Sequence, residues 1–424
     1  MASIKEPPTK TLDASFATIE TLSARCRRVH IIGAGPVGLL LTALLQSMEG
    51  VSVRLYEKRP TYTRTRMVKL ASYLVADSLE SYRPDHIDGE SIAAIFDDDE
   101  LEEGLAFRQS IPLDLMSLLR KWVQGFCPLN TIEQTLSDLI DARASKEVQR
   151  IATVMTAEDA VAMLEPGDFL IDCTGSNSLL RDHLAAGSAL GHAGANTLNI
   201  KLEYAVVITF LYGQRYLCNE YCKYVKNAGN LKYKFIPAVD RIAYDGDISH
   251  VTGIVNITAA DYEAMPPKFD GQWLRSHFPE LTQSMDRFID QIKQETPGEI
   301  LGDLEIMRIP LNLYRARNAT SRKWRAAGTR DHPFASSPVF LAGDSAIGSP
   351  YFQSISMGFE CAMFLAGLIA QRDLPLSDML DRYELYIYKQ WLRVYMRSKM
   401  IKHNKDLFES LDDTLALLKL LHIY

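Results

Sequence analysis

The chain has 424 residues, of which 47% are hydrophobic and 23% charged, and this composition excludes disordered, collagen-like and coiled-coil proteins. Lys and Arg number 46 against 53 Asp and Glu, so the net charge is −7 and the overall positive field of a nucleic-acid-binding protein is absent. Six scattered cysteines without CxxC spacing predict neither a disulfide framework nor a metal site. No apolar run approaches the ~18 residues of a membrane span, and the first residues lack the apolar centre of a signal peptide, so we expect a cytoplasmic protein.

The first part of the chain alternates between strand-like and helix-like patterns. Two strands with a helix between them form a βαβ unit, and a later helix leads to a buried strand. An acidic run over residues 96–103 predicts a solvated loop. In chain order the expected elements are a polar leader (1–25) with one short amphipathic helix, strands 28–32 and 51–56, helices 36–47 and 131–145, and strand 169–173.

From about residue 197 the pattern changes to β-branched residues and tyrosine, without regular helices between the strand-like segments. These segments (200–212, 231–239, 250–258 and 304–314) predict an antiparallel sheet, and an apolar strand over 338–342 then returns the chain to the first domain. The expected fold class is α/β, with a Rossmann-type parallel sheet, an inserted antiparallel sheet and a helical C-terminal tail. The expected domains are a leader (1–25), a discontinuous nucleotide-binding domain (26–190 and 335–375), a substrate sheet domain (191–334) and C-terminal helices (376–424).

A glycine fingerprint stands at the first strand–helix junction. Gly33, Gly35 and Gly38 match GxGxxG, where the first glycine permits the tight turn, the second lets a pyrophosphate approach and the third lets helix and strand pack closely. The helix that begins at Pro36–Val37 offers free amides to phosphates. Glu57 ends the second strand 19 residues after Gly38, where its carboxylate can accept a hydrogen bond from a ribose hydroxyl. This combination predicts a dinucleotide site.

A second motif, Gly343-Asp344, ends the strand at 338–342. A carboxylate presented there reaches the middle of a long cofactor, where FAD has a ribityl chain with hydroxyl donors and NAD has none. The alternative is that Asp344 is an ordinary helix N-cap. The loop that follows, from Gly348 through Pro350 to Met357-Gly358, precedes a helix expected over 359–371 and suits the electron-rich edge of a reduced flavin.

Together these features resemble the FAD-dependent monooxygenases of the aromatic-hydroxylase type (group A). In that family a glycine fingerprint lies near the N-terminus, a Gly-Asp motif lies about three hundred residues later, and an antiparallel substrate sheet is inserted between them. The stretch that follows Glu57, with Tyr62, Thr63 and Arg64, and the Pro350-Tyr-Phe segment resemble a MICAL-type subgroup. The resemblance implies FAD contacts from Gly33, Gly35, Pro36, Val37, Gly38, Glu57, Lys58, Arg59, Arg64, Thr174, Gly175, Gly343, Asp344 and Met357, with the backbone at Pro350, Met357 and Gly358 near the reacting edge.

Two positions depart from the family pattern. Its mid-chain Asp-Gly, followed by Ser and Arg and tied to flavin and nicotinamide binding, corresponds here to Thr174-Gly175 followed by Ser178 and Arg181. The acid is therefore replaced by threonine, which leaves the nicotinamide donor open. An arginine usually begins the helix that we match to residues 112–122, and this chain has none there. Arg64 or Arg66 is then expected to supply that contact, with surface solvation as the alternative.

The resemblance implies oxygen transfer through a flavin hydroperoxide, with NADPH or NADH as electron donor, molecular oxygen as co-substrate and an aromatic or polycyclic small molecule as substrate. Two other readings stay open. One is a flavoenzyme that transfers no oxygen, such as a dehydrogenase, reductase or cyclase, and the other is a protein that binds flavin without catalysis.

Two patterns have both a functional and a structural interpretation. Tyr204, Val206, Ile208, Phe210 and Tyr212 share one face of a strand, and that face either lines the substrate pocket or packs against a helix. Residues 382–405 carry seven Lys and Arg against one acid, interleaved with aromatic residues at helical spacing. We expect this basic helix to pack on its own domain, and contact with an anionic membrane is the less favoured alternative.

Overall fold

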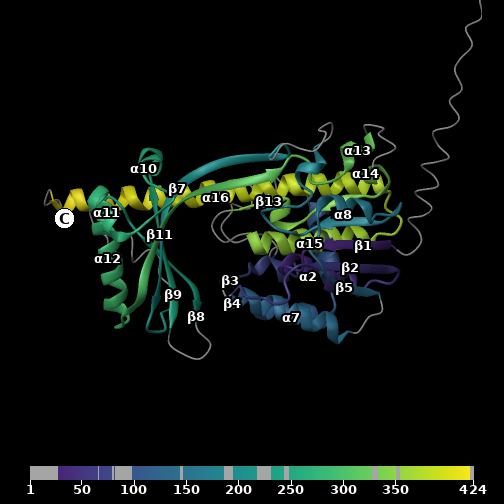
Figure 1. Ribbon diagram of the computed structural model, residues 1–424, viewed down its shortest axis with the longest axis horizontal. Coiled ribbons are helices and arrows are strands. Elements are labelled where there is room, and N and C mark those ends of the chain that lie inside the picture. Colours follow the sequence, from purple (N-terminus) through teal and green to yellow (C-terminus); the bar gives the residue numbers. More distant parts are fainter. Residues whose placement is uncertain are drawn as a thin grey trace, which may run out of the picture.

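The computed structural model builds two sheets, joined by two long strands and by one long C-terminal helix (Figure 1). In Figure 1 the parallel sheet lies on the right, the antiparallel sheet on the left, and α16 (Leu376–Leu420) runs along most of the molecule. The leader expected over 1–25 lies outside the described residues. The structure describes residues 27–64, 66–78, 81, 98–143, 147–185, 194–216, 231–242, 248–326, 333–349 and 354–420.

The first sheet has five strands in the order β12-β6-β1-β2-β5, and all four pairings are parallel. This arrangement confirms the parallel α/β sheet that the sequence predicts. It brings the late strand β12 beside β6, next to the N-terminal strand β1. The strands are β1 (Arg27–Ile32), β2 (Val51–Glu57), β5 (Val148–Ala152), β6 (Phe169–Asp172) and β12 (Val339–Leu341).

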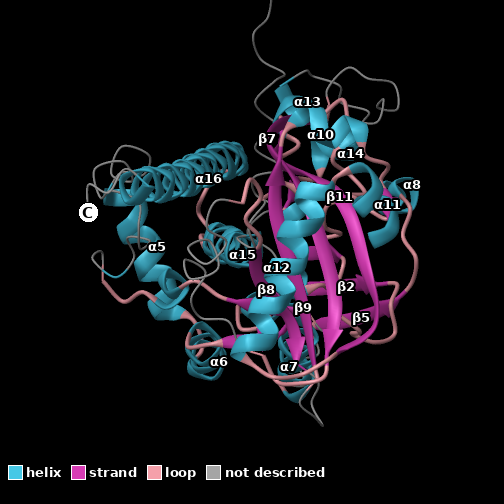
Figure 2. Cartoon of the chain, turned by 90° about the vertical axis from the view of Figure 1, so that its left-hand side faces the viewer, coloured by secondary structure: helices cyan, strands magenta, loops and turns pink. Residues whose placement is uncertain are grey.

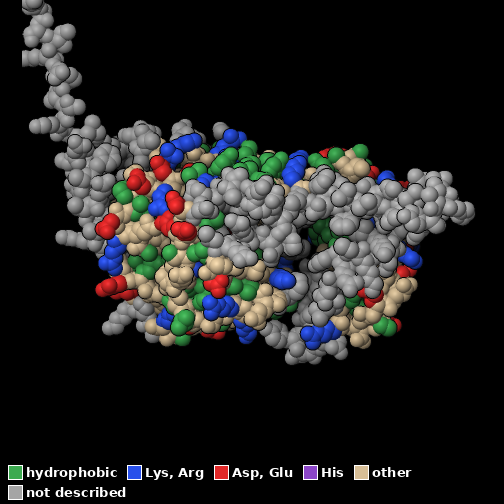
Figure 3. Space-filling view, turned by 180° about the vertical axis from the view of Figure 1, so that it is seen from behind, with side chains coloured by type: hydrophobic (Ala, Val, Ile, Leu, Met, Phe, Trp, Pro, Cys, Tyr) green, Lys and Arg blue, Asp and Glu red, His purple; other side chains and the backbone are tan. Residues whose placement is uncertain are grey.

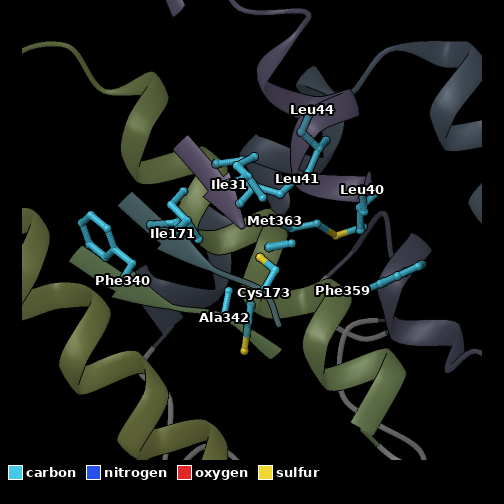
Figure 4. Packing of buried hydrophobic residues seen from close by; sticks show 14 of the residues in the cluster. Ile31, Leu40, Leu41, Leu44, Ile171, Cys173, Phe340, Ala342, Phe359 and Met363 are labelled. Atoms are coloured by element: carbon cyan, nitrogen blue, oxygen red, sulfur yellow. The ribbon is translucent and has the colours of Figure 1, made fainter. Parts of the chain in front are cut away.

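Helix α2 (Pro36–Leu45) is apolar on every side because it lies between the sheet, α7 (Leu129–Ala142) and α15 (Ser354–Ala370). Every residue from Gly38 to Leu45 is buried. Figure 4 shows how Ile31 and Ile171, from neighbouring strands, meet side chains of α2 and α15. This core fixes the helix that follows the glycine fingerprint. Around it lie α5 (Asp98–Ser110), α6 (Leu113–Val123), α8 (Ala157–Ala162) and the small pair β3 (Met67–Lys69) and β4 (Phe126–Pro128).

The second sheet is antiparallel, in the order β10-β11-β7-β9-β8, and β13 pairs with β11, so the inserted antiparallel sheet is confirmed as well. Its strands are β7 (Thr197–Tyr212), β8 (Ile236–Ile242), β9 (Ser249–Ile257), β10 (Lys268–Phe269), β11 (Ile300–Ala316) and β13 (Ile347–Gly348). Strands β7 and β11 are 16 and 17 residues long and run from this sheet back to the first domain.

The expectation that no regular helix interrupts these strands is wrong. Three helices lie between β9 and β11: α10 (Ala259–Ala264), α11 (Gly271–His277) and α12 (Pro279–Glu295). Leu281, Met285, Phe288 and Ile292 recur at helical spacing on α12 and are buried against the sheet. Figure 2 shows α12 lying across the strands. The remaining short helices are α13 (Arg322–Ala326), α14 (Pro333–Ser336) and the 3₁₀ helices η1 (Ser72–Val75), η2 (Asp182–Leu184) and η3 (Gly343–Ser345).

Helix α12 decides between the two interpretations of the β7 face. Val206, Ile208, Phe210 and Tyr212 are at most 2% exposed and belong to the cluster that contains Phe288 and the other buried residues of α12, and the half-buried Tyr204 packs against this cluster. This face is therefore core packing, and the substrate-pocket interpretation of it is wrong. The opposite face of β7 points away from α12, because successive side chains of a strand alternate between its two sides.

The acidic run expected as a solvated loop is also different in the structure. Residues 98–110 form helix α5, and its Glu100 and Glu103 pair with Lys389 and Arg382 of α16. Arg393 of α16 pairs with the buried Glu360 of α15. Basic residues of α16 thus contact acids of the same chain, as the packing interpretation expects. Within the part of the chain that the structure describes, no helix is long and apolar enough to span a membrane.

One half-buried carboxylate ties α16 to the segment between β11 and α13. Glu384 accepts hydrogen bonds of 3.0 Å from the Ala319 amide, the Thr320 amide and the Thr320 hydroxyl. Glu384→Ala leaves these buried donors without an acceptor and is expected to lower the free energy of unfolding by about 3 kcal/mol. The control is Asp381→Ala one turn earlier, which removes an exposed ion pair with Arg322 and is expected to cost about 0.5 kcal/mol. Urea unfolding measures both, and equal losses would contradict the anchoring role of Glu384.

Candidate functional site

The fingerprint glycines are required for different reasons. A Cβ on Gly33, whose φ is +100°, would lie 2.7 Å from the Cys173 carbonyl oxygen, and one on Gly38 would lie 2.0 Å from the Gly33 carbonyl oxygen. Protein packing alone explains these two. A Cβ on Gly35 would meet only the guanidinium of Arg64, at 3.4 Å. The space in front of Gly35 is therefore not filled by backbone, and α2 begins there without a side-chain cap, so its first amides are available to an anion.

Glu57 lies at the carboxyl end of β2, directly beside this turn. Its Oε2 accepts from the Ala34 amide at 2.8 Å, and its Oε1 accepts from the amide and Nε of Arg59 at 2.9 and 3.1 Å. Burial raises the pKa of Glu57, but the hydrogen bonds from Arg59 and Ala34 outweigh it and hold the pKa below its usual value. The carboxylate is therefore charged, and its weakest protein contact, the 3.5 Å hydrogen bond from Arg59 Nη2 to Oε2, is the one that a ligand hydroxyl would replace. Lys58 is exposed.

The guanidinium of Arg64 lies beside Gly35 of the glycine turn and forms an ion pair with Glu133 of α7. Glu133 is fully buried, and burial raises its pKa while Arg64 opposes that rise. The Asn130 amide of α7 donates to the Arg64 carbonyl at 2.8 Å. The helix that begins beside the site is thus α7, so the match to residues 112–122 is wrong: those residues mostly form α6, whose Leu113 is 82% exposed. Sequence reasoning missed Asn130 and Glu133, because the i, i+3 spacing that places them together is common to all helices.

Asp344 lies in the short 3₁₀ turn Gly343–Ser345 that follows β12. Among the described residues, no hydrogen-bond donor reaches its carboxylate, although burial raises its pKa to about 6, against the nearby charges of Arg64 and Arg66. The N-cap alternative is wrong, because Asp344 lies inside the turn and makes no side-chain cap. A largely buried carboxylate without a donor is unfavourable unless a ligand supplies one.

Two side chains hold the turn from its backbone side. The Tyr314 hydroxyl donates to the Asp344 carbonyl at 2.8 Å, and Arg181 donates to the Ser345 carbonyl at 3.3 Å. Burial, with the charge of Asp344, raises the pKa of Tyr314 to about 12, so this hydroxyl stays protonated and remains a donor. Both groups donate to backbone carbonyls of the turn, and neither donates to the Asp344 carboxylate. Sequence reasoning did not identify Tyr314.

Val37 joins the early and late motifs. A Cβ on Gly343, whose φ is +63°, would lie 2.9 Å from a methyl group of Val37, and a Cβ on Gly358 would lie 2.7 Å from the same methyl group. Gly343 and Gly358 therefore let the turn after β12 and the start of α15 approach α2. The fingerprint, the Gly-Asp turn and α15 meet at this point.

The expected loop before residue 359 is partly helix. Helix α15 begins at Ser354, so Met357 and Gly358 lie in its first turns, and the Met357 side chain is 1% exposed in the core. The alternation of small and apolar residues here is compatible with a buried helix, which explains the misplaced boundary. Pro350 lies outside the described residues. A role for the backbone at Met357 and Gly358 near a reacting edge stays a prediction.

Thr174 and Gly175 follow β6 and lie between the glycine turn and the Gly-Asp turn. The Cα atom of Thr174 would be 3.2 Å from a Cβ on Gly33, and the Gly175 amide donates to the Ser345 hydroxyl at 3.1 Å. The fully buried acid here is Asp172, whose carboxylate accepts from Thr174 and Ser345. An acid as the last residue of a buried strand was the available signal for Asp172, and sequence reasoning did not use it.

No family model matches the chain, and no curated protein matches its sequence. Among solved structures, the chain is similar to CabE, an aromatic hydroxylase from angucycline biosynthesis, with 16% identity, 92% of this chain and 72% of that chain covered, and a TM-score of 0.50. The Diels-Alderase PyrE3 from pyrroindomycin biosynthesis is 15% identical, with 91% of this chain and 77% of that chain covered and a TM-score of 0.49. The oxygenase that acts on 2-methyl-3-hydroxypyridine-5-carboxylic acid is also 15% identical, with 92% of this chain and 95% of that chain covered and a TM-score of 0.47. The likeness to CabE establishes the fold, a parallel α/β domain with an inserted antiparallel sheet.

The half-buried charge of Asp344 has a consequence for stability. Its pKa of about 6 in the folded chain lies above the value of an unfolded aspartate, so the folded apoprotein binds more protons between about pH 4 and pH 6 and loses stability as the pH rises through that range. Asp344→Asn is expected to raise the free energy of unfolding of the apoprotein at pH 7.5 by up to about 3 kcal/mol, and to change little at pH 4.

Urea unfolding at the two pH values measures this effect, and Asp373→Asn at an exposed position is the control. A loss of stability at pH 7.5 in Asp344→Asn would mean that protein donors satisfy the carboxylate, which contradicts the assignment.

Proposed function

We propose that the protein is an FAD-dependent monooxygenase that acts on an aromatic or polycyclic small molecule. The observation that carries the proposal is the half-buried Asp344 carboxylate, which has no protein donor among the described residues and lies at the same sheet edge as Gly35 and Glu57. A ligand that satisfies all three places needs ribose hydroxyls at Glu57, a pyrophosphate at Gly35 and, beyond the pyrophosphate, a further row of hydroxyls at Asp344. FAD has these groups in that order.

The residues present fit the cofactor. Gly35 and the uncapped start of α2 would receive the pyrophosphate, with Arg64 as the nearest cation, and Glu57 would accept from the ribose. Asp344 would accept hydrogen bonds from the ribityl hydroxyls. Tyr314 and Arg181 would keep it in place, because they bind the backbone of its turn. A bound flavin supplies redox chemistry with oxygen, and the protein's part is to bind, orient and exclude water.

The second sheet offers a surface for the substrate. Opposite α12, the half-buried side chains of Met307, Val207, Ile254 and Ile236 form one row across β11, β7, β9 and β8. Strand β8 contacts β3, which begins directly after Arg66, so this row lies on the side of the sheet near the proposed flavin site. Figure 3 shows a hollow with hydrophobic side chains between the two parts of the molecule. We infer that an apolar, ring-containing substrate lies there, and the fold shared with the aromatic hydroxylase CabE supports that class.

The proposal also covers the electron donor, the oxygen co-substrate and the location of the protein in the cell. NADPH or NADH is the proposed donor, and molecular oxygen the co-substrate. Positive and negative side chains are interspersed on the face drawn in Figure 3, which supports a small-molecule enzyme rather than a nucleic-acid-binding protein. A cytoplasmic location remains part of the proposal.

The first test is the cofactor. We expect the purified protein to bind FAD non-covalently and turn yellow. Glu57→Ala removes the acceptor for the ribose hydroxyls and is expected to weaken FAD binding by about tenfold to a hundredfold. Glu49→Ala, which removes an exposed carboxylate just before the opposite end of β2, is the control and is expected to leave the affinity within about twofold. Fluorescence titration with FAD measures these values. A protein that takes up no FAD would overturn the proposed function.

The second test concerns the donor. Because Thr174 stands where the resemblance implies an acid, we expect NADPH or NADH to reduce the bound flavin slowly until an aromatic substrate is present. Stopped-flow absorbance under anaerobic conditions measures the reduction, and steady oxygen uptake with either nicotinamide distinguishes a monooxygenase from flavoenzymes that transfer no oxygen. Fast reduction without substrate would contradict the expectation from Thr174. Turnover of substrate without oxygen uptake would favour a flavoenzyme that transfers no oxygen. No turnover at all would favour a protein that binds flavin without catalysis.

A further inference from the structure

We propose that Asp172 is a positioning residue that fixes the Gly343–Ser345 turn, and with it the Asp344 carboxylate, through Ser345 and through Ser178 and Arg181. The inference rests on the proposed flavin site, because the group that Asp172 positions is Asp344.

The carboxylate of Asp172 accepts five hydrogen bonds. Its Oδ1 accepts from the amide and hydroxyl of Thr174, at 2.8 and 2.6 Å, and from the Ser345 hydroxyl at 3.1 Å. Its Oδ2 accepts from the Ser178 hydroxyl at 2.7 Å and the Leu180 amide at 2.8 Å. A carboxylate has about four lone-pair positions, so these donors use all of its capacity. Asp172 is 0% exposed and therefore cannot itself contact a cofactor.

Two routes lead from Asp172 to the Gly-Asp turn. The direct route is the Ser345 hydroxyl, which donates to Asp172 and accepts from the Gly175 amide. The second route passes through Ser178, whose hydroxyl accepts from the Arg181 amide at 3.0 Å. The guanidinium of Arg181 then donates to the carbonyls of Asp344 and Ser345, at 3.5 and 3.3 Å. Both routes end on the backbone that carries the Asp344 carboxylate.

The threonine at position 174 follows from the same geometry. The Thr174 hydroxyl donates to Asp172 and accepts from the Leu179 amide at 3.0 Å. A carboxylate at position 174 could not donate, and it would lie beside the buried charge of Asp172, where like charges repel strongly. Asp172 and Thr174 are therefore a matched pair, and an acid at one position excludes an acid at the other.

The experiment compares the two ends of one strand. Asp172→Asn at the carboxyl end of β6 is expected to weaken FAD binding by at least about tenfold and to move the flavin midpoint potential to a more positive value, because a buried negative charge beside the flavin-binding turn is lost. Asp168→Asn is the control. Asp168 directly precedes β6, is buried and accepts from His30 and the Glu165 amide, at 3.2 and 3.1 Å. We expect its loss to lower the melting temperature while FAD affinity stays within about twofold and the potential stays unchanged.

A second set of variants keeps the test decisive if Asp172→Asn folds poorly. Thr174→Asp alone is expected to weaken FAD binding, because it places two carboxylates side by side, and Asp172→Asn combined with Thr174→Asp is expected to recover most of the affinity. Additive losses in the double variant would overturn the inference. So would FAD binding in Asp172→Asn equal to the wild type, or equal effects of the Asp168 and Asp172 variants on FAD. Absence of FAD binding in the wild type would instead overturn the proposed function.

Discussion

The arrangement of the site depends on one half-buried charge. The Asp344 carboxylate is largely removed from water, has no hydrogen-bond donor among the described residues and carries a pKa raised to about 6. Such a group is costly in the apoprotein, and it keeps its place only because its backbone is fixed on the other side by Tyr314, Arg181 and Ser345. Within the part of the chain that the structure describes, this acceptor is thus held in place without a donor, and such a group is typical of a binding site.

The position of that charge follows from the topology of the first sheet. Strands β1, β2, β6 and β12 are parallel, so their carboxyl ends meet at one edge, although they are separated by up to about three hundred residues in the chain. Small residues make the contact possible, since Gly343 and Gly358 both pack against Val37. The buried helices α2 and α15 pack against this edge, and α15 contacts the turn that carries Asp344.

The sequence was sufficient for the features that local pattern encodes. The period of the apolar residues predicted a parallel sheet and an inserted antiparallel sheet. Glycine spacing with Glu57 predicted the turn and the carboxylate that the structure places side by side. What it could not provide are the contacts between distant segments. Alternation along β7 shows which residues share a face, but only the docking of α12 decides that Val206 and Phe210 are core. Likewise, the roles of Asp172 and Tyr314 depend on the turn that contains Asp344. That residue lies 172 positions after Asp172 and 30 positions after Tyr314 in the chain.

The central claim, that Asp344 receives the hydroxyl groups of bound FAD, is tested most directly by proton release on binding. If the ionised carboxylate accepts these hydrogen bonds, FAD lowers the pKa of Asp344 from about 6, so binding at pH 6 releases about half a proton and binding at pH 8 releases almost none. Calorimetric titration of the apoprotein with FAD in two buffers of different ionisation enthalpy measures this number. Release at pH 6 that disappears in Asp344→Asn is the predicted result. FAD binding without proton release at pH 6 would contradict the claim.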